Sequence, residues 1–480
     1  MEPRVFGAVD IGASGGRVMA GVVEDANGTP TLHTVRRFAN GMVRRDGHLR
    51  WDLTRLIEEV LTGLTDLARE FPQVESIGID TWAVDYALLD SDLRLLAEPI
   101  SYRDERGASE VSGVHSRVTA EELYDINGLQ HLPFTTLFQL AAEKRSSLWD
   151  KAAHIVLLPD LIAYRLSGVL RTEATNASTT GLLDARTGVW SEPLMRRLGL
   201  PMGRLAPLVS PGDTLGQITR DVAARTGMRP GTVVTAVGSH DTASAVVAVP
   251  AATPHFAYVS SGTWSLAGLE LDKPVLTPES RAANFTNEGG VDGRIRYLRN
   301  IGGLWLLQES LRTWPERGVT VDQESVLRQA EELPSGGPVV DVDDESFIAP
   351  GDIPSRITQA AGTPDMSPAE TVRCILDSLA AAYARTINQA ARLAERTVEV
   401  IHIVGGGSRN ALLCQLTAHL AGIPVTGGPI EATALGNILV QARAHGAAPG
   451  SLEEMRAQLS RTGLAAGVVK VYLPDGTLST

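Results

Sequence analysis

The segment VFGAVDIGASGGRVMAGVV, residues 5–23, decides the fold class of this chain. Its apolar runs predict a buried strand over Val5–Ile11 and a partner strand over Arg17–Val23, joined by a turn over Gly12–Gly16. Glycines in such a turn let backbone N–H groups approach an anion and cradle it. Asp10 ends the first strand, where its carboxylate is placed to hold Mg²⁺ through water. An ordinary glycine hairpin with a solvated Asp10 is the alternative.

An amphipathic helix and a second strand follow this hairpin. Apolar residues recur at spacings of three and four over residues 53–71, and Asp52 is placed to cap that helix. The run VESIGID, residues 74–80, then predicts a strand, and this order indicates an open α/β sheet with ligands at the carboxyl ends of its strands. The sequence does not decide whether Trp82 packs in the core or contacts a ligand. The candidate ligand contacts at this strand end are Asp80, Trp82 and Asp85.

Chain length and an internal repeat both predict two domains. The chain has 480 residues, whereas a single core stops growing at about 250–300. The segment PAATP, residues 250–254, breaks the chain, and the strand, small-residue turn and strand that follow over residues 255–271 repeat the opening hairpin in outline. We therefore predict domains over residues 1–249 and 250–480.

Two further stretches place small or polar residues between a strand and a helix. In VGSHDTASAV, residues 237–246, Asp241 is a candidate base for phosphoryl transfer, and a helix N-cap is the alternative. The strand over residues 398–404 leads into Gly405–Ser408 ahead of a helix that begins near Asn410. Glycines at that place let a flat base or a phosphate lie against the backbone.

Composition and charge exclude several classes of function. The formal net charge of −13 argues against nucleic-acid partners, which require clustered Lys and Arg. No uncharged apolar run approaches the length of about 18 residues needed for a membrane span, and no signal-peptide pattern opens the chain, so we expect a cytoplasmic protein without a membrane role.

Cys374 and Cys414 are expected to be buried thiols. The charge run ISYRDER, residues 100–106, predicts a solvated loop.

The lysines exclude one way of binding ATP. None of them follows a glycine, so the chain has no GxxxxGK[ST] phosphate loop. If the protein binds ATP, it therefore does so by another architecture. The lysines are Lys144, Lys151, Lys273 and Lys470.

Nine stretches together resemble the FGGY family of carbohydrate kinases, within the actin/hexokinase/Hsp70 ATPase superfamily. The stretches include AVDIGASGGRVM, GIDTWAVDYALLD, VGSHDTASAV, YVSSGTWSLAG, NFTNEGG, LRNIGGLWLLQES and HIVGGGSRNALLCQL. The resemblance covers nearly the whole chain. It implies an α/β fold of two actin-like ATPase (ribonuclease H-like) domains with a nucleotide and substrate cleft between them. It also implies ATP-dependent phosphorylation of a sugar hydroxyl, with Mg²⁺ as the metal.

The resemblance further implies a role for individual residues. Asp241 is similar to the proton acceptor of the family, and Asp10 to its Mg²⁺-associated carboxylate. The implied substrate contacts, which join the strand-end candidate Trp82, are Ala83, His240, Asp241, Thr242 and Asn300. The implied ATP contacts are Ala13, Ser14, Gly15, Gly16, Arg17, Thr263, Gln308 and Gly406. Two positions depart from the family pattern, because Gly15 replaces a serine and Ala83 replaces a glycine. Two alternatives stay open. Within the family, the substrate is one of several ketoses or polyols, and outside it, the protein is a regulator that binds sugar or nucleotide without catalysis.

Overall fold

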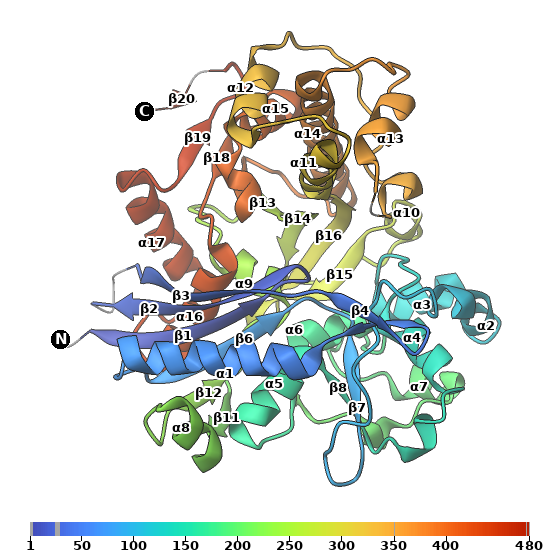
Figure 1. The fold of residues 1–480 in the computed structure, drawn as a ribbon, viewed down its shortest axis with the longest axis vertical. Coiled ribbons are helices and arrows are strands. Elements are labelled where there is room, and N and C mark those ends of the chain that lie inside the picture. Colours follow the sequence, from blue (N-terminus) through green and yellow to red (C-terminus); the bar gives the residue numbers. More distant parts are fainter. Residues whose placement is uncertain (1–2, 25–28, 350, 477, 480) are drawn as a thin grey trace. The chain divides into compact units, whose positions relative to one another are not determined.

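The chain forms two compact units in a computed structural model that describes residues 3–24, 29–349, 351–476 and 478–479 (Figure 1). The first unit contains residues 1–248, 270–297 and 432–459, and the second contains residues 249–269, 298–431 and 460–480. Two segments from the second half of the sequence thus pack with the first half. The predicted division after residue 249 stays a prediction.

The first unit is built on a six-stranded sheet with the strand order β11-β12-β6-β1-β2-β3. The central strand β1 pairs antiparallel with β2 and parallel with β6, so the predicted hairpin and open α/β sheet are confirmed. The strands are β1 Arg4–Ile11, β2 Gly15–Val23, β3 Thr31–Ala39, β6 Ser76–Thr81, β11 Thr214–Gln217 and β12 Val233–Thr235.

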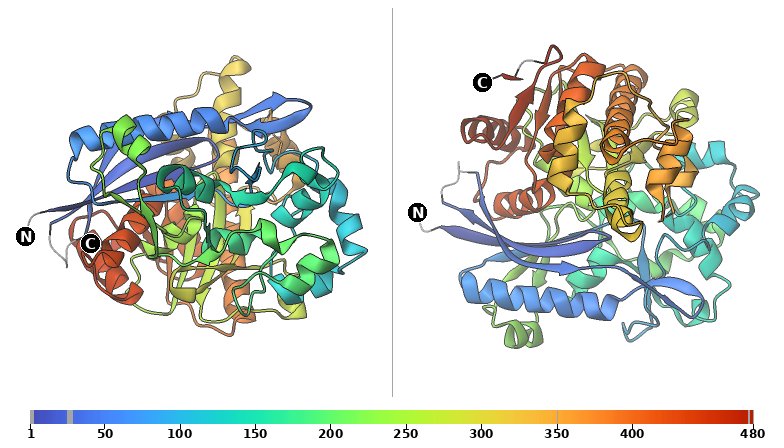
Figure 2. Two further views of the ribbon diagram at one scale, coloured as in Figure 1. Left: turned by 90° about the horizontal axis from the view of Figure 1, so that it is seen from below. Right: turned by 45° about the horizontal axis from the view of Figure 1, so that its top comes forward.

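Helices cover both faces of this sheet, which explains why β1 is apolar at nearly every position. The core under α1 (Leu53–Glu70) includes Val5, Val9 and Ile11. Phe6 and Ala8 instead pack with α16 (Ala432–Ala444). Figures 1 and 2 show α1 lying along the sheet in each view. The Asp52 side chain accepts a hydrogen bond from the Arg55 N–H, so the predicted N-cap is confirmed.

The turn between β1 and β2 is shorter than the predicted Gly12–Gly16, because Gly15 and Gly16 belong to β2 and pair with β3. Neither glycine adopts a positive φ. Instead, Gly16 is required by packing, because a Cβ there would lie 2.3 Å from the Phe38 ring. The prediction of a glycine-rich turn is therefore right about its place and wrong about its length, because its last two glycines belong to β2.

The second unit repeats the opening arrangement of the first. Strand β13 (Phe256–Ser261) pairs antiparallel with β14 (Trp264–Leu271) and parallel with β17 (Val400–Val404), as β1 does with β2 and β6. The predicted repeat is thus confirmed at the level of topology. The order continues through β18 (Val425–Gly427), β19 (Lys470–Tyr472) and β20 (Leu478–Ser479).

The remaining elements complete the two units. In the first unit they are β4 Met42–Arg45, β5 His48–Trp51, β7 Tyr86–Leu89, β8 His154–Leu157, β9 Thr172–Glu173, β10 Leu208–Val209, β15 Thr286–Gly289, α2 Val111–His115, α3 Ala120–Asn127, α4 Thr136–Glu143, α5 Leu158–Ser167, α6 Ala174–Ala177, α7 Glu192–Leu198, α8 Arg220–Thr226, α9 Asp241–Val247 and α10 Pro278–Ala282. In the second they are α11 Trp305–Glu316, α12 Gln323–Glu332, α13 Ile353–Ala360, α14 Pro368–Leu393 and α15 Ala411–Ala421. Among the described elements, three contain residues of both units, namely β14, β16 (Ile295–Gly302) and α17 (Leu452–Ala465).

The charge run at residues 100–106 is not the solvated loop that the sequence predicts. The Asp104 carboxylate accepts hydrogen bonds from the N–H groups of Leu49 and Arg106, at 3.0 and 3.1 Å. The Arg106 side chain is only 10% exposed, pairs with Glu143 and lies over the Tyr86 ring. Partners distant in sequence thus draw this segment inward.

Two other expectations bear on the rest of the chain. Both cysteines are buried free thiols, as predicted, and burial raises the pKa of Cys374 to about 11 and that of Cys414 to about 12. Within the described ranges, no helix is both long enough and apolar enough to span a membrane.

Candidate active site

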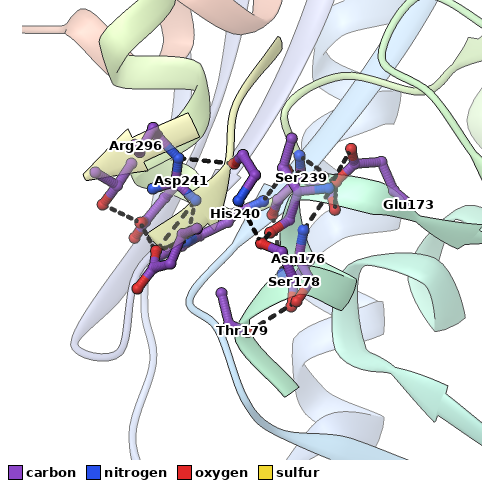
Figure 3. Close-up of polar contacts among 12 residues, drawn as sticks. Glu173, Asn176, Ser178, Thr179, Ser239, His240, Asp241 and Arg296 are labelled. Carbon is purple, nitrogen blue, oxygen red and sulfur yellow. Dashed lines mark hydrogen bonds and ion pairs between the residues drawn. The ribbon is translucent and has the colours of Figure 1, made fainter. Parts of the chain in front are cut away.

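The polar triplet predicted to carry the chemistry lies at the start of α9 (Figure 3). His240 is the N-cap residue, and Asp241 is the first residue of the helix. The Asp241 side chain makes no capping bond. Its Oδ1 accepts a hydrogen bond from Thr242 Oγ1 at 3.0 Å, and the side chain is 31% exposed, whereas His240 and Thr242 are buried. The alternative of Asp241 as N-cap is therefore wrong, and its carboxylate is accessible to a ligand.

The backbone holds this triplet beside the carboxyl end of β6. The Thr81 N–H donates to the Ser239 carbonyl at 2.9 Å, and Thr81 and His240 form a parallel bridge. In the neighbouring strand pair, Asp10 of β1 lies opposite Asp80 of β6. The structure thus brings Asp10, the residues after β6 and the triplet to one edge of the sheet, where ligands bind in open α/β folds.

Carboxylates concentrate negative charge at this edge. The pKa of Asp80 is raised well above its ordinary value, first by complete burial and then by the charges of Asp10 and Asp241. Its Oδ2 accepts a hydrogen bond from Asn437 Nδ2 at 2.6 Å, whereas no described residue gives Oδ1 a partner. Asp10 is nearly buried, and Arg17 contacts its Oδ2 through Nε at 2.8 Å and Nη2 at 2.7 Å. Negative charge on these carboxylates favours a cation beside them, as the position of the Arg17 guanidinium shows.

An asparagine that the sequence gave no reason to select stabilises the turn before β2. Asn40 Nδ2 donates to the Gly12 carbonyl at 2.9 Å, and the Asn40 N–H donates to the Ser14 carbonyl at 3.3 Å. Ser14 is exposed and Ala13 is partly buried. The conformation of the turn therefore depends on hydrogen bonds from Asn40, which lies 28 positions from Gly12 in sequence.

The segment after β6 holds a strained turn. Val84 has φ = +66°, a conformation that is unusual for a β-branched residue. Its carbonyl accepts hydrogen bonds from Thr136 Oγ1 at 2.7 Å and from Gln139 Nε2 at 3.3 Å, both in α4. These bonds fix the backbone next to Ala83, which is partly buried. Strain maintained in this way is typical of ligand-binding segments.

Asp85 and Trp82 belong to the core. The buried Asp85 Oδ2 accepts hydrogen bonds from Trp51 Nε1 at 2.6 Å and Trp82 Nε1 at 2.9 Å, and the two indole rings lie 4.2 Å apart between centroids. Asp85 is therefore a structural residue and not the ligand contact that its position suggested. The core interpretation of Trp82 is favoured, and its contact with substrate stays a prediction.

Asp85 makes stability depend on pH. Burial raises its pKa to about 6, despite the two indole hydrogen bonds that lower it, so the folded chain binds this proton more tightly than the unfolded chain does. The stabilisation by that proton is present below about pH 4 and is lost as the pH rises to about 6. Relative to Asp85→Asn, wild type should lose about 3 kcal/mol between pH 4 and 7. The difference in Tm between the two proteins across this range measures the effect.

An exposed aspartate supplies the control for that measurement. Asp92 lies on the surface and pairs with Arg94, so Asp92→Asn should leave the pH dependence of Tm unchanged. A difference between wild type and Asp85→Asn that does not vary with pH would contradict a raised pKa at Asp85.

A buried carboxylate anchors the residue ahead of the triplet (Figure 3). Glu173 Oε2 accepts hydrogen bonds from the Ser239 N–H at 3.0 Å and from Ser239 Oγ at 2.6 Å. The same side chain caps α6 through the N–H groups of Thr175 and Asn176. Burial raises the pKa of Glu173, and the hydrogen bonds from Ser239 and Thr175 lower it in part. Glu173 therefore orders the loop that presents Asp241, although nothing in the sequence singled it out.

The predicted ATP contacts of the second unit lie around one turn. Thr263 lies between β13 and β14, where the Leu304 N–H donates to the Gly262 carbonyl and the Trp305 N–H to the Thr263 carbonyl, both at 3.1 Å. Gln308 is exposed in the first turn of α11. Asn300 is partly buried on β16.

The glycine segment after β17 packs against the base of this turn. A Cβ on Gly407 would lie 2.1 Å from Ser261 Oγ, and Gly405 adopts φ = +83° with no room for a side chain before the Ser261 carbonyl. Gly406 between them faces open space. The Tyr383 hydroxyl forms a hydrogen bond with Ser261 Oγ at 3.2 Å. Glycine is thus required here by close backbone approach, and Gly406 is left accessible to a ligand.

Sequence comparison identifies the family. The fold is α/β, and residues 5–248 match the N-terminal domain and residues 257–445 the C-terminal domain of the FGGY family of carbohydrate kinases, which are phosphotransferases. The chain belongs to the FGGY family of carbohydrate kinases. It is therefore an enzyme whose substrates are ATP and a sugar, as the sequence predicted.

Individual relatives narrow the comparison. The chain is 39% identical over 463 residues to the rhamnulokinase of Bacteroides thetaiotaomicron, covering 95% of this chain and 94% of the relative. It is 43% identical over 446 residues to the rhamnulokinase of Pectobacterium carotovorum subsp. carotovorum, covering 92% and 88%. The solved gluconate kinase from Lactobacillus acidophilus shares the fold, with a TM-score of 0.80 at 18% identity over 98% of this chain and 94% of that one.

Proposed function

We propose that this kinase transfers the γ-phosphoryl group of ATP to the C1 hydroxyl of L-rhamnulose and releases L-rhamnulose 1-phosphate and ADP. The observation that carries this proposal is the accessible Asp241 carboxylate at the sheet edge, next to the buried His240 and Thr242. The identity of the sugar is supported by the two rhamnulokinases to which the chain is similar.

Asp241 acts as the base in this reaction. Its carboxylate accepts the proton of the C1 hydroxyl while the hydroxyl oxygen forms a bond to the γ-phosphorus. The bond from that phosphorus to the bridging oxygen breaks, and ADP departs with the electron pair. Because the transition state is loose, alignment and charge neutralisation supply most of the rate.

The other predicted contacts bind and orient the two substrates. Ala13, Ser14, Gly15, Gly16 and Arg17 in the first unit, and Thr263 in the second, contact phosphate groups of ATP. Gln308 and the open Gly406 contact the nucleotide. Trp82, Ala83, His240, Thr242 and Asn300 contact the sugar. Each of these proposed roles is supported by the position of the residue in its own unit and by the resemblance of its stretch to the family.

Asp10 is the residue that would hold Mg²⁺. Hard oxygen donors suit this ion, which is usually bound by one or two carboxylates together with phosphates. Asp10 lies opposite Asp80 at the end of the paired strands β1 and β6, so two carboxyl groups adjoin at this edge of the sheet. When bound, Mg²⁺ neutralises charge on the transferring phosphates.

A panel of sugars tests the assignment of the substrate. With purified enzyme, ATP and Mg²⁺, ADP release should depend on sugar, and kcat/KM for L-rhamnulose should exceed that for L-fuculose, D-xylulose or glycerol by about 10-fold or more. A greater kcat/KM for another member of the panel would replace L-rhamnulose as the substrate. ATP binding with no ADP release for any sugar would instead favour a regulator.

A further inference from the structure

The imidazole ring of His240 is surrounded by charged side chains from three elements of the first unit (Figure 3). Its Nδ1 lies 3.0 Å from Nη2 of Arg296 on β16 and 3.3 Å from Oε2 of Glu288 on β15. Its Nε2 lies 3.5 Å from Oδ1 of Asp241 on α9. The Nδ1 edge of the ring therefore contacts a buried charge pair, and Nε2 lies toward the Asp241 carboxylate.

The Arg296 side chain is held in a fixed position. It is completely buried, its Nε donates to the Gly289 carbonyl at 2.8 Å, and its Nη2 lies 3.1 Å from Glu288 Oε2. Burial raises the pKa of Glu288, but the opposing effects, of which the charge of Arg296 is the largest, hold this pKa below its ordinary value. Glu288 is thus a carboxylate, and the Glu288–Arg296 pair carries no net charge.

The chemistry of the guanidinium determines where the imidazole proton lies. A guanidinium has hydrogen-bond donors and no acceptor, so His240 Nδ1 must accept the hydrogen bond from Arg296 Nη2. The ring proton is then on Nε2, which faces Asp241. A second proton on Nδ1 would oppose an N–H group of Arg296 and place two positive charges at hydrogen-bond distance.

We propose that Arg296 and Glu288 are positioning residues that hold His240 as the neutral tautomer protonated at Nε2. The Nε2–H then donates to a sugar oxygen next to the hydroxyl that Asp241 deprotonates. The 3.5 Å separation of Nε2 from Asp241 Oδ1 exceeds a normal hydrogen bond, so this donor stays available to a ligand. The identity of the sugar oxygen rests on the proposed function, whereas the tautomer does not.

Loss of Arg296 should change the charge of the ring. The charged or titratable groups that face His240, or flank its loop on β6 and β9, are Asp241, Glu288, Arg296, Asp80 and Glu173. Without the guanidinium, Nδ1 faces the Glu288 carboxylate, which favours a doubly protonated ring. That imidazolium would lie beside Asp241 and weaken the carboxylate as a base.

Kinetics of two variants test this consequence. Arg296→Met should lower kcat about 10-fold near neutral pH, with the loss shrinking as the pH rises and the imidazolium gives up its proton. The double variant Arg296→Met/Glu288→Gln removes both charges and should lose that pH dependence. Arg294→Met, on the same hairpin but partly exposed and paired with Asp272 and Glu453, is the matched control. An equal loss at every pH, or a loss in KM alone, would overturn the proposal.

A spectroscopic measurement tests the tautomer without any substrate. In protein labelled with ¹⁵N-histidine, the wild-type His240 signals, assigned by their absence in His240→Gln, should report an unprotonated Nδ1 and a protonated Nε2. A protonated Nδ1 in wild type would overturn the proposal, even if Arg296→Met proves unable to fold. If the wild-type tautomer is as expected but L-rhamnulose gives no ADP release, the proposed substrate fails and the positioning of His240 stands.

Discussion

Replacement of Asp241 by Asn is expected to lower kcat by about 100-fold or more, the scale of losing a general base. Asparagine has nearly the same shape, and its carbonyl oxygen still accepts the hydrogen bond from Thr242 Oγ1, so the geometry of the triplet is preserved. The carboxamide cannot take the proton of the sugar hydroxyl. Because the loss arises in the chemical step, KM for both substrates should change little. Steady-state ADP release in a coupled assay measures the effect.

A second aspartate in a first helical turn serves as the control for this variant. Asp221 lies in the first turn of α8, and Asp221→Asn alters the charge of a helix start in the same way without touching the sheet edge. Its kcat should equal that of wild type. Near wild-type turnover in Asp241→Asn would exclude this residue as the base.

Replacement of Gly436 by Ala is expected to destabilise the first unit by about 3 kcal/mol, the upper end of the usual cost of overpacking. A Cβ on Gly436 would lie 1.8 Å from the carbonyl oxygen of Ser244 and 2.7 Å from its carbonyl carbon. Because those atoms are backbone, α16 and α9 must separate to admit the methyl group. Tm should fall by about 5–10 °C, and activity should fall as well, since α9 begins at Asp241.

A glycine in open space isolates the steric cause of that loss. A Cβ on Gly113, within α2, would meet no atom within 4 Å. Gly113→Ala should therefore leave Tm unchanged or raise it slightly, because Ala favours the helix over Gly. If Gly436→Ala unfolds at the temperature of wild type, the close contact between α16 and α9 does not contribute to stability.

Local sequence signals predicted much of the framework correctly. The alternation of apolar runs and glycines identified the β1–β2 hairpin, and the spacing of Leu residues with Asp52 identified α1 and its cap. These features depend on residues within about one turn or one strand of each other, so the pattern contains the physical cause.

Predictions failed where a distant partner decides the environment. Asp85 lies in the core because Trp51, 34 residues earlier, donates to its carboxylate. The charge run at residues 100–106 is drawn inward because Glu143 pairs with Arg106. In both cases the local sequence is polar and indicates a surface, and only a long-range contact makes burial favourable.

The sequence by itself determined the class of this protein. The glycine turns, the triplet containing Asp241 and the matching stretches define an FGGY carbohydrate kinase before any coordinate is known. The tertiary structure alone decided how the triplet is held. Arg296 lies 56 residues from His240 in sequence and Glu173 lies 66 residues from Ser239, and neither belongs to a local motif. These hydrogen bonds join side chains that come together only after the sheet has folded. Because the partners are far apart in sequence, no periodic pattern of residues indicates them.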